Sequence, residues 1–121
     1  MEQLVTSLIA FALASAAMGQ QAPTICRTVH GRMMAANGNP ALRIWEVGTR
    51  HYLGVDVDQD LSLDQIPDNL RQTWTAGMKG SLWETSLYGD FRVCAWKPRR
   101  PGEMEIVRVT SGRNLIVGPY R

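Results

Sequence analysis

The chain has 121 residues, of which 45% are hydrophobic and 20% are charged, and its formal net charge is +2. This is the composition of one small globular domain, and it argues against a disordered or fibrous chain. The charge is too small and too evenly mixed to indicate binding to phosphate backbones, so we expect no nucleic-acid partner.

Residues 4–18 form an apolar run without charge. The run is too short for a membrane span of about 20 residues but is typical of a secretory signal peptide, and small residues before Gln20 suit cleavage there. Glu2 and the lack of a basic residue near the start depart from that pattern; an uncleaved anchor or an apolar core helix is the alternative. We predict a signal peptide over residues 1–19 and a secreted or periplasmic domain over residues 20–121, with no membrane span after processing.

The two cysteines, Cys26 and Cys94, lie far apart in the mature chain. Disulfides form and persist in oxidising compartments, so export favours a bond between them. Two buried free thiols are the alternative.

Alternating patterns predict a domain made mostly of short strands. The expected strands are residues 26–34, 41–47, 50–57, 90–96, 103–110 and 113–117. The Asn37-Gly38 pair predicts a tight hairpin turn between the first two strands. Within the long segment 58–88, Ile66, Leu70 and Trp74 recur at a helical spacing, and Pro67 is tolerated only near the first turn of such a helix. Short strands with frequent turns are typical of a sandwich or a small barrel.

Three stretches carry a resemblance to a known family: VHGRM (residues 29–33), NGNPALRIW (37–45) and YGDFRV (88–93). Together they resemble the transthyretin-like and carboxypeptidase-regulatory-like β-sandwich, and the chain is also similar to uncharacterised small exported bacterial proteins. The resemblance implies an all-β fold, a single antiparallel β-sandwich. The segment 58–88 is a long insert outside that pattern, in which we expect the short helix. It carries no catalytic or ligand-binding motif over to this chain.

The two histidines are the candidate catalytic residues of the chain. The chain has no phosphate-binding loop, dinucleotide fingerprint, nucleophile elbow or Cys-x-x-Cys motif, and we expect no cofactor. His30 and His51 are the candidates for a general base, paired with a carboxylate, in a small hydrolase. The other interpretation, which we prefer, is that both are polar residues of the sheet.

The alternating carboxylates Asp56, Asp58 and Asp60 suggest a calcium loop. Leu61 stands where such a loop needs glycine, and Pro67 stands where it needs glutamate, so a helix-loop-helix calcium site is excluded. A looser calcium site is one interpretation of these carboxylates. The other, which we prefer, is a solvated acidic loop.

Trp45 and Trp96 alternate with the apolar residues of their strands, which predicts that at least one of them faces outward. With Arg99 and Arg100 of the basic, proline-bounded loop 97–102, they form the predicted binding face, for a cell-envelope glycan or protein. Burial of the tryptophans in the core is the alternative. The function predicted from the sequence is therefore an exported, non-enzymatic binding or structural module, and the alternative is a small hydrolase using His30 or His51.

Overall fold

The computed structural model describes residues 25–58, 61–97 and 99–120 of the chain. In chain order the elements of these residues are β1 (Cys26–Ala35), β2 (Leu42–Glu46), β3 (Tyr52–Val55), η1 (Leu63–Gln65), α2 (Asp68–Gly77), η2 (Leu82–Glu84), β4 (Thr85–Lys97) and β5 (Glu105–Pro119). The expected signal peptide, residues 1–19, and its cleavage point before Gln20 lie outside the described residues. None of the helices within the described ranges is long and apolar enough to cross a membrane.

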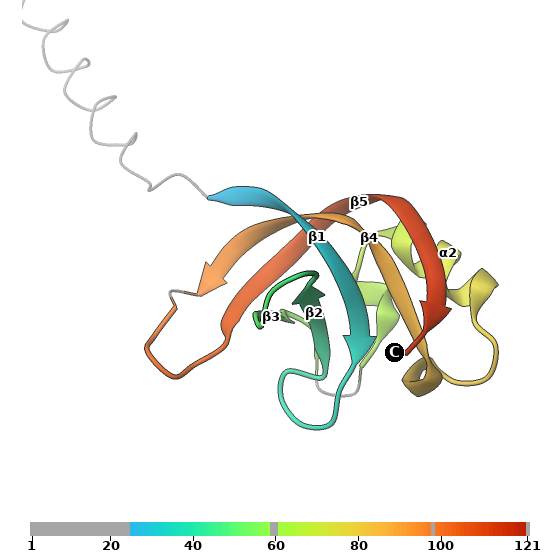
Figure 1. Ribbon diagram of the computed structural model, residues 1–121, viewed down its shortest axis with the longest axis horizontal. Helices are drawn as coiled ribbons and strands as arrows, with labels where there is room; N and C mark the ends of the chain where they lie inside the picture. The colour runs from blue at the N-terminus through green and yellow to red at the C-terminus, as the bar shows by residue number, and fades with distance from the viewer. Residues whose placement is uncertain (1–24, 59–60, 98, 121) are drawn as a thin grey trace, which may run out of the picture.

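The strands form one closed barrel in the order β1-β2-β3-β5-β4. Neighbouring strands are antiparallel except β3 and β5, which run parallel. The barrel closes where β1 pairs with β4, from Cys26 opposite Cys94 to Met33 opposite Leu87. Figure 1 shows β1, β4 and β5 curving over the molecule, with the shorter β2 and β3 below them in this view.

This barrel shows that the β-sandwich expected from the sequence patterns and from the transthyretin-like resemblance is wrong. A sandwich needs strands divided between two sheets, whereas β4 pairs here with both β1 and β5, and β5 pairs with both β4 and β3. β4 has 13 residues and β5 has 15, and register shifts near Asp90, Val93 and Lys97 bend the pair around the core. The expected strands 103–110 and 113–117 are two parts of the single strand β5.

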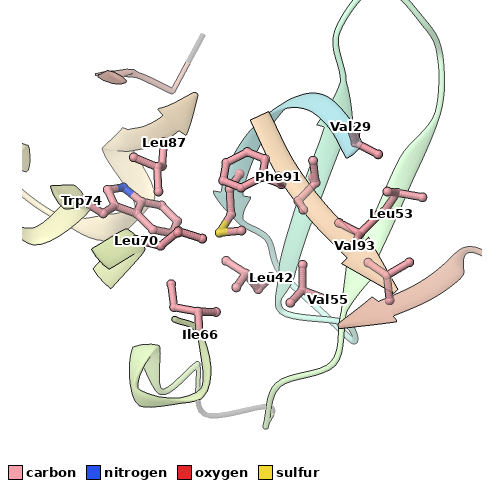
Figure 2. Close-up of a cluster of buried hydrophobic side chains, with 13 residues drawn as sticks. Val29, Leu42, Leu53, Val55, Ile66, Leu70, Trp74, Leu87, Phe91 and Val93 are labelled. Atoms are coloured by element: carbon pink, nitrogen blue, oxygen red, sulfur yellow. The ribbon is translucent and has the colours of Figure 1, made fainter. Parts of the chain in front are cut away.

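The barrel interior is filled by apolar side chains from the strands and the helical segment. They are Val29, Met33, Leu42, Ile44, Leu53, Val55, Ile66, Leu70, Trp74, Leu87, Phe91, Val93 and Val107. The predicted helix is confirmed: α2 follows Pro67, and its residues Leu70 and Trp74 are fully buried. Figure 2 shows both of them beside Leu87, at one end of the cluster, with Val93 toward the other. Helix α2 packs against β5 and β4 and so covers that end of the core.

Two glycines lie opposite each other where β1 pairs with β4, each close to a side chain of the next strand of the barrel. Gly31 pairs in register with Gly89. A Cβ atom at Gly31 would collide with the side chain of Ile44, and one at Gly89 would lie 2.7 Å from Cδ2 of Leu115. The tight coiling of the barrel at this level therefore requires residues without side chains.

The expected disulfide is confirmed. Cys26 and Cys94 are bonded to each other and lie directly opposite in the β1–β4 ladder. Beside them the Ala95 amide donates a 2.8 Å hydrogen bond to the carbonyl oxygen of Ile25. The covalent bond therefore joins β1 to β4 at the end of the pairing that closes the barrel.

Candidate functional site

A row of outward-facing side chains crosses the barrel on four neighbouring strands. Tyr52 of β3 pairs in register with Trp45 of β2, Trp45 pairs with Arg32 of β1, and Arg32 pairs with Tyr88 of β4. These positions alternate with buried residues on every strand, so their side chains lie on the outer surface. Neighbouring strands are about 4.8 Å apart, which gives the row a length of about 14 Å. We call these four residues, with Tyr120 beside Arg32, the arginine–aromatic row.

Hydrogen bonds of the β2–β3 turn anchor Trp45 in this row. Its indole Nε1 donates a 2.8 Å hydrogen bond to the carbonyl oxygen of Thr49. The Thr49 hydroxyl in turn donates to the carbonyl oxygen of Glu46 at 2.7 Å and accepts from the His51 amide at 3.0 Å. Gly48 has a φ of 83°, a conformation that favours glycine and lets this turn close tightly. The indole is therefore held in one orientation before any ligand arrives.

Arg32 lies among aromatic side chains. Its guanidinium carbon is 5.2 Å from the centre of the Trp45 ring and 5.5 Å from the centre of the Tyr120 ring. Its Nη2 contacts the sulfur of Met34 at 3.6 Å, and within the described ranges its buried Nε has no hydrogen-bond partner. Other arginines pair with carboxylates: Arg27, Arg71 and Arg108. No such ion pair is found for Arg32 among the residues the structure describes, so cation–π contacts hold its charge in place.

A cavity of about 240 Å³ lies beside Tyr52, at the connection between β4 and β5. Three basic and three acidic side chains line it: Arg27, His51, Arg99, Glu46, Glu103 and Glu105. Arg27 donates two hydrogen bonds of 3.1 Å to Glu105, and this carboxylate holds the pKa of the Arg27 guanidinium above its ordinary value. Next to Tyr52, the cavity therefore adds a surface that carries carboxylates as well as cations.

The four tryptophans have different environments. Trp74 belongs to the core, Trp45 is half-buried in the row, and Trp83 and Trp96 are exposed. Arg108 stacks over Trp96 at 3.4 Å from the ring centre and also bonds Asp56 at 3.2 Å.

The residues of the predicted binding face are brought together only in part. Trp45 stands in the row, whereas Trp96 lies near the far end of β4 from Tyr88. Arg99 lines the cavity beside Tyr52, and Arg100 lines a different cavity with Ile106.

His30 and His51, the candidate bases, occupy different sites. Nδ1 of His30 lies 2.7 Å from a carboxylate oxygen of Asp90, whereas His51 lines the cavity beside Tyr52. The other Asp90 oxygen accepts a 2.8 Å hydrogen bond from Asn114. These bonds, that of Asn114 first and that of His30 second, hold the pKa of the Asp90 carboxyl below its ordinary value of 3.8. His30 thus has the carboxylate partner that the hydrolase hypothesis required.

The candidate calcium ligands are partly described. Asp60 lies outside the described residues. Asp56 bonds Arg108, and a carboxylate oxygen of Asp58 accepts a 2.7 Å hydrogen bond from Gln65. The described part of the chain holds no group of three or more His, Cys, Asp or Glu side chains placed to bind a metal ion.

Sequence reasoning missed most of the row. Alternation along β1 places Arg32 on the outer side of its strand, and this much was visible in the sequence. The neighbours of Arg32 come from other strands, however, and only the pairing registers place Tyr52, Tyr88 and Tyr120 near it or in line with it.

A five-stranded Greek-key barrel with a helix between β3 and β4 is the architecture of the OB-fold. This likeness concerns architecture alone, and an argument for function must come from the side chains. Comparisons of the chain with protein-family models, curated proteins and solved structures found no match.

Proposed function

We propose that this protein is an exported, non-enzymatic binding module of the cell envelope or secreted space, and that the arginine–aromatic row holds a glycan chain. The observation that carries the proposal is the row itself, in which aromatic rings from adjacent strands lie side by side with Trp45 already anchored. Flat rings with polar edges suit the apolar faces and hydroxyl groups of sugars. A row of about 14 Å, three strand spacings long, suits an extended chain more than a compact small molecule.

Export is supported by two observations. The apolar run of residues 4–18 is typical of a signal peptide, and the Cys26–Cys94 disulfide is typical of an oxidising compartment. A cell-envelope or extracellular location places the row where glycans are abundant, and this is the physical basis for choosing a glycan as the ligand.

The charges near the row favour a glycan over a nucleic acid. Nucleic-acid binding requires several cations aligned with successive phosphates. Arg32 is the basic member of the row, and Arg43, on the same outer side of β2, donates to the carbonyl oxygens of Pro40 and Asn37. The adjoining cavity brings carboxylates as well as cations, which would repel a dense polyanion.

The hydrolase hypothesis keeps one specific observation in its favour, the contact between His30 and Asp90. A carboxylate in this position orients a histidine that acts as a general base. Within the described ranges, however, no serine, threonine or cysteine side chain hydrogen bonds to His30. A screen of ester and glycoside substrates with wild type and His30→Ala would detect this activity if it exists.

The binding proposal is tested with the purified, oxidised protein and a panel of cell-envelope polysaccharides. We expect Tyr52→Ala and Trp45→Ala to weaken binding by about tenfold or more, because each removes a stacking surface. Trp83→Ala is the matched control, since Trp83 is an exposed tryptophan outside the row. Thermal unfolding of each variant shows whether the barrel is intact. Equal binding by Tyr52→Ala, Trp83→Ala and wild type would refute a role for the row.

A further inference from the structure

Arg32 is the residue in the row whose chemistry can select a ligand. Aromatic rings accept many sugars, but a guanidinium group selects an anion. On the described part of the chain, Arg32 is a half-buried arginine on this face without a carboxylate partner, while Arg27 nearby is neutralised by Glu105. Its charge is therefore available to a ligand.

The surroundings of Arg32 prepare the guanidinium to receive an anion. Contacts with the Trp45 and Tyr120 rings fix its position, so little side-chain freedom is lost when a ligand binds. Its Nε is buried, and among the described residues the hydrogen-bond acceptor of its Nη2 is the thioether of Met34, a weak acceptor that a carboxylate oxygen can replace. Nη1 is not buried, and it has no hydrogen-bond partner within the described ranges. Nη1 and Nη2 together offer the two parallel donors of a bidentate contact.

We infer that the ligand of the row is an acidic glycan, with a sugar carboxylate bound by Arg32 while neighbouring sugar rings stack on Trp45 and Tyr52. This inference rests on the proposed glycan-binding function and names the class of sugar. One arginine balances one negative charge, which matches the single carboxylate of a uronic acid. The fitting ligand is therefore a chain with one uronic acid among neutral sugars, because the carboxylates that line the cavity beside Tyr52 would repel further charged sugars.

The test compares two probes that differ only in charge: a short neutral oligosaccharide chain that contains one uronic acid, and the same chain with that carboxylate methyl-esterified. Calorimetric titration of the oxidised wild-type protein measures the affinity for each. We expect the acid form to bind at least about tenfold more tightly, because a charge-assisted bidentate contact is lost on esterification. We also expect the preference to shrink as sodium chloride is added, since salt screens a contact at the surface.

Variants of Arg32 assign the preference to this residue. Arg32→Gln should bind the acid chain about as weakly as wild type binds the ester, with its affinity for the ester little changed. Arg32→Lys, which keeps the charge but loses the planar pair of donors, should fall between the two. The matched control is Arg92→Gln, because Arg92 is an exposed arginine of β4 outside the row. Because the ester experiment uses wild-type protein alone, it decides the question even if the Arg32 variants unfold.

The outcomes separate the two proposals. If acid and ester chains bind equally well and Arg32→Gln changes neither affinity, the acidic-glycan inference is wrong while glycan binding stands. If neither chain nor any polysaccharide of the panel binds, both proposals fail. Tighter binding of single-stranded oligothymidylate than of the acid chain would assign the row to nucleic acid, and selective binding of an envelope protein would assign it to a protein partner. Either of these results would also overturn the inference.

Discussion

Removal of the disulfide should cost the barrel a large share of its stability. The Cys26–Cys94 bond spans a sequence separation of 68 residues. In the chain-entropy model, closing a loop of that length stabilises the folded state by about 4 kcal/mol, because the unfolded chain loses freedom. Small domains have a total free energy of unfolding of about 5–15 kcal/mol. The barrel is therefore expected to fold without the bond, but only marginally.

Urea unfolding of wild type and of the Cys26→Ala/Cys94→Ala variant measures this contribution. For a denaturant dependence of about 1–2 kcal/mol per molar urea, a loss of about 4 kcal/mol lowers the midpoint by about 2–4 M. Alanine suits both positions because Cys94 is buried and a polar replacement would add a desolvation cost. Reduction of the wild type should give the same midpoint as the variant, and a reductant should leave the variant unchanged. An oxidised wild type and a variant that unfold at the same urea concentration would refute the reasoning.

Three further predictions concern the core, the barrel wall and a surface carboxylate. Trp74→Ala should lower the free energy of unfolding by about 3–5 kcal/mol in urea titrations, because it empties a fully buried site; a loss below 1 kcal/mol would contradict that packing. Gly31→Ala should cost about 1–3 kcal/mol by the same measurement, because the added methyl group meets Ile44, whereas Thr28→Ala on the exposed side of β1 should change it by less than about 0.5 kcal/mol. The lowered pKa of Asp90 stabilises the fold above pH 3.8, and this contribution is lost as the pH falls through the folded-state pKa. The melting-temperature gap between wild type and Asp90→Asn should therefore be wide at pH 6 and narrow toward pH 2.5; a gap independent of pH would show that the carboxylate charge does not matter.

Individual strands and the helix were predictable where the spacing of apolar residues along the sequence indicates them. Alternation around Val29 and Met33 defines β1, and the spacing of Leu70 and Trp74 defines the buried side of α2. The pair Asn37-Gly38 does mark a turn, but the connection runs from Ala36 to Ala41, whose backbones share a 2.8 Å hydrogen bond, and so it is wider than a two-residue hairpin.

The arrangement of the strands was not predictable, because a strand with one buried side has the same pattern in a sandwich and in a barrel. What distinguishes the two is which strands pair across the closure, and here the deciding pairs are β1 with β4 and β3 with β5. The Ser111-Gly112 pair looks like a turn in the sequence, yet the structure continues β5 through it. Gly112 lies opposite Phe91, and a Cβ there would come within 2.9 Å of Leu70, so this glycine serves close packing under the helix.

The candidate site could be predicted only in part for the same reason: the sequence does not show which strands pair with each other. Trp45 was predicted as a binding residue because it alternates with the apolar residues of its strand. Arg32 was not predicted as a binding residue, since the rings that surround it are distant in the sequence.

The arginine–aromatic row is discontinuous in sequence. Its residues Arg32, Trp45, Tyr52, Tyr88 and Tyr120 come from β1, β2, β3, β4 and the segment after β5. No synthetic peptide cut from the chain can contain the row, because it exists only once β1 has paired with both β2 and β4. A ligand of the row would accordingly bind the folded state alone and oppose unfolding of the whole barrel, by about 2.7 kcal/mol at a hundredfold excess over its dissociation constant. Protection of the entire chain against heat or protease would then serve as a direct way to screen for that ligand.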